Sequence, residues 1–296
     1  MVRYLRSQEN EVIATDLPRE KEEGPLDASN TRLQSMDVRD RAQVDRIIEG
    51  FGPEVIYHFA GQAFVIPSWA DPQGTMTTNL YGTLNLLEAL RYHSPRTRFA
   101  FAGSGTEYGD PEIIPTPESA PLKPTSPYAT SKAAADLLCY QYFRSFDIPV
   151  FRCRIFGTTG PGKRGDSVND FASQIVGLER EGRAGTLHVG NLEKSRDVTD
   201  VRDAIRAMTC VVERGEPGGA YNIGSGVPRQ VKETLTQLIS LARVAVTPEI
   251  DPARIRKVDE PVHLADVERL RKLGWAPQIP FHRTLEETLE YWRAQP

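Results

Sequence analysis

The chain has 296 residues, of which 39% are apolar, and a formal net charge of −4 at pH 7. This length can bury one large core or two unequal ones, and the acidic balance argues against a nucleic-acid-binding surface, which would be basic. No apolar run approaches the roughly 18–20 residues that span a bilayer, and residues 1–6 lack the apolar core of a secretory signal. We therefore expect a cytoplasmic protein without a membrane segment.

The three cysteines, Cys139, Cys153 and Cys210, lie in apolar periodic segments without CxxC or Cys/His spacing. This placement predicts small buried hydrophobic side chains in a reducing compartment rather than disulfides. It also predicts no metal site.

Strand and helix patterns alternate along the first half of the chain. They predict a strand at 11–15, a helix at 44–50, a strand at 55–59, a helix at 74–93, a strand at 98–102, a helix at 126–146 and a strand at 150–155. Such alternation predicts an α/β fold with a doubly wound parallel sheet and helices on both faces. A fold of this kind binds its ligand at the carboxyl ends of the strands.

The pattern loosens after residues 160–162. Segments near 167–195 and 227–296 are shorter and richer in Arg, Glu and Pro. We predict a dinucleotide-binding domain over 1–160, to which residues at about 196–226 return, and a smaller substrate-binding lobe over most of 161–296.

Tyr128 and Lys132 lie four residues apart at the start of a helix-forming run, so they share one helix face. An ammonium beside a phenol favours the phenolate and lowers the tyrosine pKa from about 10. Tyr128 is therefore a candidate proton donor or acceptor for an alcohol/ketone couple. The same spacing is also common in surface pairs. It gains weight here from the small polar turn at 103–109, where a hydroxyl could bind the same substrate oxygen.

Several further motifs occur in a fixed order. They are HFAGQA at 58–63, NLYGTLNLLEA at 79–89, RDVTDVRD at 196–203 and YNIGSG at 221–226. With the Tyr/Lys pair, they resemble an extended short-chain dehydrogenase/reductase that acts on nucleotide sugars. The resemblance covers nearly the whole chain and is closest to the GDP-4-keto-6-deoxy-D-mannose reductase and GDP-mannose 4,6-dehydratase group.

The resemblance implies NAD or NADP as cofactor. Asp16 closes the 11–15 strand, where a carboxylate accepts both adenosine-ribose hydroxyls and repels a 2′-phosphate, which favours NAD over NADP. Arg19 could instead pair with that phosphate, or belong to a solvated charged run. Further cofactor contacts are implied for Asp37, Val38, Phe59, Ala60, Gly61, Gln62, Asn79, Tyr128 and Lys132. The alternatives are a loop cap for Asp37 and a buried amide that ties two backbones for Asn79.

The family's fold opens with a strand and a Gly-rich turn that approaches the pyrophosphate. This chain shows no such turn near its start, and residues 2–7 resemble the end of the helix that follows it. We therefore expect the first strand and turn to be lacking, either through a fragmentary record or in a shortened fold.

On the substrate side, the resemblance implies that Arg196 and Arg256 grip the diphosphate of the sugar nucleotide, since guanidinium groups bind phosphate through paired hydrogen bonds. Asn169 and Asn191 lie in segments similar to those that contact base and phosphate. Gly157 is a departure, because the family commonly has asparagine there. A nucleotide-sugar substrate and a homodimer are expected.

The turn at 103–109 separates two activities. The dehydratase pattern is [ST]-x-E-x-Y-G, whereas here Ser104 takes the hydroxyl position, Thr106 replaces the glutamate and Glu107 comes one residue late. On an extended segment that slip would point Glu107 to the opposite face.

We therefore favour a reductase of a GDP-4-keto-6-deoxyhexose that forms GDP-rhamnose. The candidate catalytic residues are Ser104, Thr106, Glu107, Tyr128 and Lys132. The alternatives are a GDP-mannose 4,6-dehydratase, an NAD-dependent 4-epimerase and a catalytically decayed nucleotide-sugar-binding protein.

Overall fold

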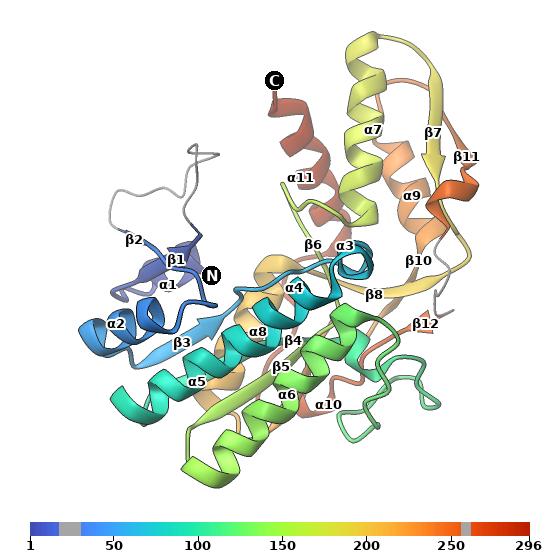
Figure 1. Cartoon of the computed structure of the whole chain (residues 1–296). Coiled ribbons are helices and arrows are strands. Elements are labelled where there is room, and N and C mark those ends of the chain that lie inside the picture. Colours follow the sequence, from blue (N-terminus) through green and yellow to red (C-terminus); the bar gives the residue numbers. More distant parts are fainter. Residues whose placement is uncertain (18–30, 256–261) are drawn as a thin grey trace. The chain divides into compact units, whose positions relative to one another are not determined.

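The computed structural model describes residues 1–17, 31–255 and 262–296 (Figure 1). The chain divides into two compact units. The first unit comprises residues 1–103, 126–153 and 212–220, and the second comprises 104–125, 154–211 and 221–296. Each unit is thus built from discontinuous segments. The predicted roles of the two domains, a dinucleotide-binding domain over 1–160 and a substrate-binding lobe over most of 161–296, stay a prediction.

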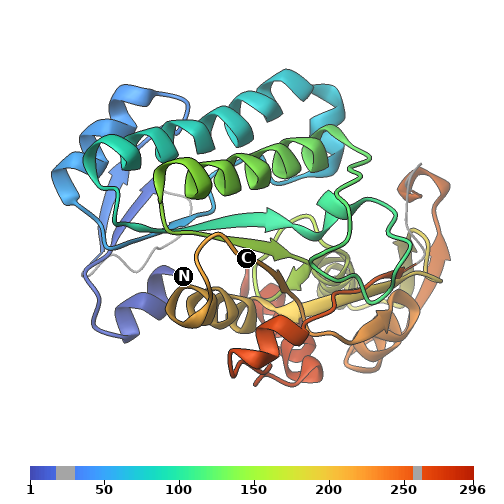
Figure 2. The same ribbon diagram turned by 90° about the horizontal axis from the view of Figure 1, so that it is seen from below.

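The first unit holds the alternating elements. They are α1 (Val2–Ser7), β1 (Ile13–Asp16), β2 (Arg32–Ser35), α2 (Arg41–Phe51), β3 (Val55–His58), α3 (Val65–Ala70), α4 (Pro72–Met76), the π-helical turn η1 (Thr77–Tyr81), α5 (Gly82–His93), α6 (Pro127–Phe146) and most of β4 (Arg98–Ser104) and β5 (Val150–Ile155). Helices α5 and α6 cover one face of strands β3 and β4 (Figure 2). The predicted helix at 74–93 is thus divided into α4, η1 and α5.

Strands β1 and β2 pair in parallel, as do β3 and β4. The strand order of the larger sheet is β3-β4-β5-β9, where β9 spans Ala220–Ile223, and β1 and β2 form a separate two-stranded sheet. The predicted α/β fold with parallel strands is confirmed. The expectation of a lacking first strand and Gly-rich turn stays a prediction.

The core of the first unit lies between these helices and strands. Its buried residues include Leu87, Leu90, Phe99, Phe101 and Cys139. All three cysteines are buried, as predicted, and none of them forms a disulfide with a described residue. Among the residues that the structure describes, no helix has the length and apolarity needed to cross a membrane.

The second unit centres on β8 (Ser195–Asp200), which pairs antiparallel with β10 (Pro228–Gln230) and parallel with β6 (Gly157–Thr159) and β12 (Val262–His263). The remaining elements are the 3₁₀ turn η2 (Gly105–Tyr108), α7 (Ser167–Glu181), β7 (Gly185–Val189), most of α8 (Val201–Arg214), α9 (Val231–Ser240), β11 (Val246–Ile250), the 3₁₀ turn η3 (Pro252–Arg254), α10 (Glu268–Lys272) and α11 (Phe281–Ala294). Helices α7, α9 and α11 share a core with β7.

Candidate active site

Helix α6 carries the Tyr/Lys pair. Ser126 caps it, because the Ser126 hydroxyl accepts a hydrogen bond from the Ala129 N–H at 3.1 Å, and Pro127 supplies a pre-set φ at the first helical position. Tyr128 is half-buried and Lys132 is buried one turn later. The predicted helix, and with it the shared face of the two side chains, is confirmed.

Lys132 is fixed beside the end of β4. Its Nζ donates to the Ala102 carbonyl at 2.9 Å and lies 5.2 Å from the centroid of the Phe101 ring. Burial and, to a smaller extent, the Lys132 charge lower the pKa of His58 to about 3. Ala102 precedes Ser104 by two residues on the same strand. The ammonium is therefore held by the strand that leads into the Ser104 turn.

Ser104 and Thr106 bring two hydroxyls together in the turn that follows β4. Their oxygens lie 2.9 Å apart, and the Thr106 N–H donates to the Ser104 hydroxyl at 3.3 Å. The turn is a 3₁₀ helix, so the prediction that Glu107 lies on an extended segment is wrong. In a 3₁₀ turn, hydrogen bonds within the turn set the side-chain directions.

Glu107 is nevertheless directed away from solvent, with a side chain that is 0% exposed. Its Oε1 accepts from the Ser104 backbone N–H at 2.6 Å, which completes a capping box with the Ser104 side chain. Its Oε2 lies 3.6 Å from Nε of Arg154. The carboxylate is therefore committed to holding the turn that carries Ser104.

Arg154 and Asn222 support this turn and were not predicted. Arg154 Nη1 donates to the Tyr108 hydroxyl and to the Glu118 carbonyl, both at 3.0 Å, and the Tyr108 hydroxyl donates to Asn222 Oδ1 at 2.7 Å. The available signal was an arginine inside the predicted strand at 150–155, since helices on both faces of a doubly wound sheet would bury that strand. Such a side chain needs a buried acceptor or anion.

On the cofactor side, Asn79 lies in the π-helical turn η1 and is buried. Its Oδ1 accepts from the Gln62 N–H at 2.7 Å, and its Nδ2 donates to the Gln62 carbonyl at 3.0 Å and to the Ser131 hydroxyl at 2.8 Å. The alternative considered for Asn79, a buried amide that ties separate segments together, is therefore present.

Gly61 belongs to the segment that Asn79 holds. A Cβ at Gly61 would lie 2.7 Å from Asn79 Oδ1 and 3.7 Å from Lys132 Nζ. Only glycine permits this approach, which brings the exposed segment after β3 against the Lys132 ammonium. Phe59 and Ala60 are exposed beside it, and Gln62 is half-buried.

Two acidic residues lie at the ends of the first two strands: Asp16 is the last residue of β1, and Asp37 follows β2 by two residues. Asp16 is half-buried, and its Oδ1 accepts from the Leu17 N–H at 2.9 Å. Asp37 accepts from the Arg39 backbone N–H at 2.9 Å and forms a two-pronged bond with the Arg39 side chain, which holds the pKa of Asp37 below its usual range. Asp37 thus caps its own loop, while Val38 is buried. Arg19 lies outside the described residues.

The predicted substrate residues of the second unit form hydrogen bonds within that unit, mostly to nearby backbone groups. Asn169 donates to the Gly160 carbonyl at 3.1 Å, and its Oδ1 accepts from Trp292 Nε1 at 3.0 Å. Asn191 Oδ1 accepts from the Glu193 N–H at 3.0 Å. Arg196 Nη1 donates to the Ser195 carbonyl at 3.0 Å. Arg256 lies outside the described residues.

Gly157 has a structural reason. A Cβ there would lie 2.6 Å from the backbone oxygen of Asp197, because β6 runs directly against β8. An asparagine at this position would force the two strands apart. The departure from the family's usual residue is therefore matched to a close strand pair.

Comparison with known proteins shows the family of this chain. The sequence model of the family described as GDP-mannose 4,6 dehydratase matches residues 2–288. The chain belongs to that family. A GDP-6-deoxy-D-mannose reductase from Pseudomonas aeruginosa is 33% identical over 247 residues, which cover 82% of this chain and 81% of that protein. A dTDP-D-glucose 4,6-dehydratase from Mus musculus is 27% identical, covering 89% and 74%.

Solved structures agree with this membership. RMD from Pseudomonas aeruginosa complexed with NADPH is 30% identical, with a TM-score of 0.82 and coverage of 91% of this chain and 93% of that one. A UDP-glucose 4-epimerase from Thermotoga maritima with UDP-glucose is 26% identical, with a TM-score of 0.88 and coverage of 99% and 94%. The predicted membership of a nucleotide-sugar oxidoreductase, dehydratase and epimerase group is confirmed.

Proposed function

We propose that this member of the family reduces the C4 ketone of a GDP-4-keto-6-deoxyhexose derived from mannose and forms GDP-rhamnose. The observation that carries the proposal is the direction of Glu107. Its buried carboxylate accepts from the Ser104 backbone, while Thr106, at the position of the dehydratase glutamate, brings a hydroxyl to Ser104. Reduction needs a proton donor and a hydride but no carboxylate at C5. The similarity to the Pseudomonas reductase supports the same reading.

The residues at the strand ends fit a dinucleotide cofactor. Asp16 offers a carboxylate suited to ribose hydroxyls, and Gly61 lets the exposed segment after β3 approach Lys132. Solved relatives contain NADPH or NAD. When bound, the reduced nicotinamide would supply the hydride for C4. Asp16 favours NAD, since it would repel a 2′-phosphate.

In this proposal the chain itself moves one proton. Tyr128 donates it to the C4 oxygen as negative charge develops there, and Lys132 stabilises the phenolate that remains. The Ser104 hydroxyl donates a hydrogen bond to the same oxygen. Glu107 and Arg154 keep the Ser104 turn in place before the substrate arrives, so the donor needs no reorganisation during the reaction.

An assay of NADH consumption distinguishes the reductase activity from the dehydratase activity. With GDP-mannose and NAD(P)+, the protein should form no 4-keto-6-deoxy product. With the keto sugar and NADH, it should consume the cofactor stoichiometrically, because reduction is not redox-neutral. Rapid dehydration that disappears in Glu107→Gln would show that Glu107 turns towards C5, and the reductase assignment would give way to the dehydratase.

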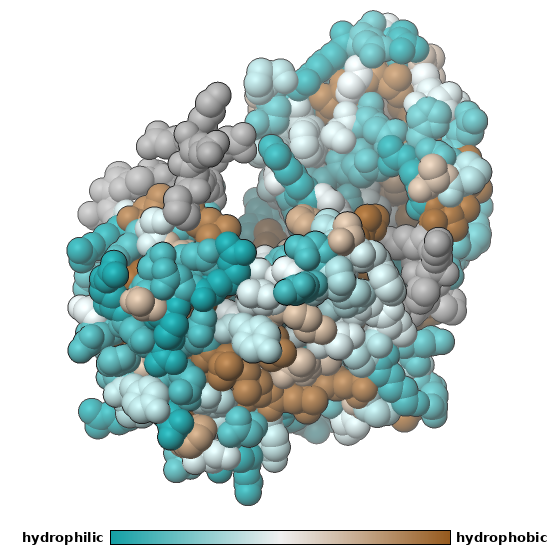
Figure 3. Space-filling model, viewed as in Figure 1, coloured by the Kyte–Doolittle hydropathy of each residue, from teal (hydrophilic) through white to brown (hydrophobic). Residues whose placement is uncertain are grey.

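We also propose a homodimer formed through the face of α5 and α6. Figure 3 shows an apolar patch over these helices, and Leu137 and Tyr140 on α6 are 57% and 42% exposed. Sedimentation should give a dimer for the unmodified chain and a monomer for Leu137→Glu. The three buried cysteines, which form no disulfide with a described residue, support a cytoplasmic location.

A further inference from the structure

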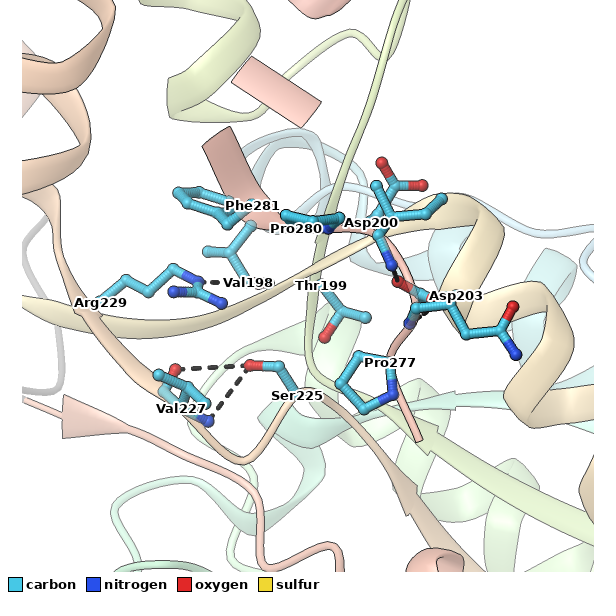
Figure 4. A pocket seen from close by; sticks show the side chains of 12 residues that line it. Val198, Thr199, Asp200, Asp203, Ser225, Val227, Arg229, Pro277, Pro280 and Phe281 are labelled. Atoms are coloured by element: carbon cyan, nitrogen blue, oxygen red, sulfur yellow. Dashed lines mark hydrogen bonds between the residues drawn. The ribbon is translucent and has the colours of Figure 1, made fainter. Parts of the chain in front are cut away.

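Two buried threonines differ in what their hydroxyl groups bind. Thr199 lines a pocket of about 270 Å³ in the second unit, beside Ser225 and Pro277 (Figure 4). It is 3% exposed, and its hydroxyl has no hydrogen-bond partner among the described residues. Thr83, in the first unit, is 0% exposed and bonds to groups from two other elements. The hydroxyl of Thr83 is therefore part of a network, whereas that of Thr199 is not.

Thr83 receives a hydrogen bond from His58, a residue to which the proposed function gives no role. His58 ends β3, opens the HFAGQA motif and is buried. Its Nε2 lies 3.0 Å from Thr83 Oγ1. The Thr83 hydroxyl has one proton, which it donates to the Asn79 carbonyl at 2.6 Å. The Thr83 oxygen must therefore accept from His58, so the imidazole carries its proton on Nε2.

The imidazole of His58 is held in place and stays neutral. Its ring packs against two rings of the neighbouring strand β4, with centroid distances of 5.7 Å to Phe99 and 6.2 Å to Phe101. Burial and the charge of Lys132 lower the pKa of His58 to about 3. A neutral imidazole donates from one nitrogen only. The direction of its bond to Thr83 is therefore fixed near neutral pH.

Asn79 connects this bond to two other segments. It lies in the π-helical turn η1, a type of turn that is frequent at functional sites. Its side chain holds both backbone groups of Gln62 and donates to the Ser131 hydroxyl. Ser131 in turn donates to the Tyr128 carbonyl at 2.7 Å. The network thus runs from the end of β3 through η1 to the segment of Gln62 and to the first turn of α6.

We propose that His58 is a positioning residue of the reductase site, an inference that rests on the proposed function for its catalytic part. By fixing η1, His58 sets the direction of the Asn79 amide. A Cβ at Gly61 would lie 2.7 Å from Asn79 Oδ1 and 3.7 Å from Lys132 Nζ, so a rotated amide would displace the segment beside the ammonium. The first turn of α6, which carries Tyr128, would move with it. A misplacement of about 1 Å can lower a rate about 10²-fold.

Hydrogen exchange of the Gln62 amide tests the structural part without cofactor or substrate. That N–H donates to Asn79 Oδ1, so its protection reports the direction of the Asn79 amide. His58→Phe keeps an aromatic ring and loses the donor, which should speed the exchange about tenfold, as for one lost hydrogen bond. His58→Gln keeps an N–H donor and should restore most of the protection. An exchange rate that His58→Phe leaves unchanged would overturn the proposal.

Thr83→Val breaks the same path at its second member. It should speed the Gln62 exchange as His58→Phe does, and the double variant should be no faster than the faster single, because both remove one interaction. Thr75→Val is the matched control, since the Thr75 hydroxyl is buried on α4 and also donates to the carbonyl four residues earlier, at 2.8 Å. Thr199→Val removes a hydroxyl without a bond. Effects that multiply in the double variant, or equal acceleration in either control, would contradict the path.

Kinetics with the keto sugar and NADH test the catalytic part. His58→Phe and Thr83→Val should lower kcat about 10- to 100-fold and leave KM for the keto sugar nearly unchanged, because a misplaced Tyr128 affects the reacting atoms. His58→Gln should recover most of kcat. A raised KM with unchanged kcat, or no recovery in His58→Gln, would refute the positioning role. If wild type reduces no keto sugar while the Gln62 exchange responds as expected, the proposed function fails and the structural role of His58 stands.

Discussion

The two parts of the proposed active site differ in how their geometry arises. On helix α6, Tyr128 and Lys132 share a face because they are one helical turn apart. In the turn after β4, Glu107 is placed by the backbone of Ser104 and by Arg154, which comes from a different strand. The helix pair is a local property of the chain, whereas the turn depends on distant contacts. Substitutions at the helix pair should therefore lower turnover, whereas substitutions at the turn should first lower stability.

The largest effect is expected at the helix pair. Tyr128→Phe keeps the ring and removes the transferable proton, so turnover should fall by about 10²–10⁴-fold with sugar-nucleotide binding retained. NADH oxidation with the keto sugar measures turnover, and calorimetry measures binding. Tyr140→Phe, at an exposed position on the same helix, is the control. Retention of more than a tenth of the wild-type activity would show that Tyr128 is not the proton donor.

Lys132→Met should also lower turnover, and it should move the pH optimum upward. Without the ammonium, the Tyr128 phenol loses a neighbouring positive charge that favours its ionised form. A pH–rate profile compares this variant with Lys123→Met, which removes an exposed ammonium paired with Glu112. An unchanged optimum in Lys132→Met would show that Lys132 does not act on the phenol.

At the turn, the expected loss is first one of stability. Arg154→Met removes the cation beside the buried Glu107 carboxylate, which should lower the free energy of unfolding by about 3–5 kcal/mol. Urea unfolding measures it, with the exposed Arg144→Met as control. Adding Glu107→Gln should recover part of the loss, since no buried charge then remains. A single-variant loss below about 1 kcal/mol, the range of surface pairs, would contradict the network.

One histidine in each unit should make stability depend on pH: His58, which is buried, and His263, which is half-buried. Burial lowers the pKa of His58 to about 3 and of His263 to about 4, from 6.5. Between pH 6.5 and about 4, the unfolded chain binds protons that the folded chain does not. Stability should therefore fall as pH falls, by up to about 1.4 kcal/mol per pH unit for each ring.

Urea unfolding at several pH values tests this expectation. His263→Phe should reduce the slope of the unfolding free energy against pH by the contribution of one histidine. This holds whatever the substitution does to stability at a single pH. The exposed His188→Phe is the control and should leave the slope unchanged. An identical slope in wild type and His263→Phe would show that His263 is protonated in the folded protein.

The smallest effect is expected at the cofactor end of the first unit. Wild type should prefer NADH to NADPH, and Asp16→Ala should narrow that preference, since the repulsion of a 2′-phosphate is lost. The ratio of kcat/KM for the two cofactors measures it. Equal use of both cofactors by wild type would show that residues other than Asp16 decide the choice.

The sequence by itself determined the alternating α/β order of the first half and the helix that presents Tyr128 and Lys132. Both follow from short-range periodicity, which needs no knowledge of distant contacts. The same reasoning gave the family, through motifs whose order and spacing are also properties of the chain. It did not give α3 or the π-helical turn at Asn79, because neither has a periodic signal of its own.

Only the tertiary structure decided where Glu107 points. The sequence argument assumed an extended segment, whereas a 3₁₀ turn, a capping box and Arg154 direct the carboxylate inward. It also decided that the amide of Asn79 is held by Gln62 and Ser131. A side chain's partners come from segments far away in the chain. Its freedom to act on a ligand is therefore set by folding and not by its neighbours in sequence.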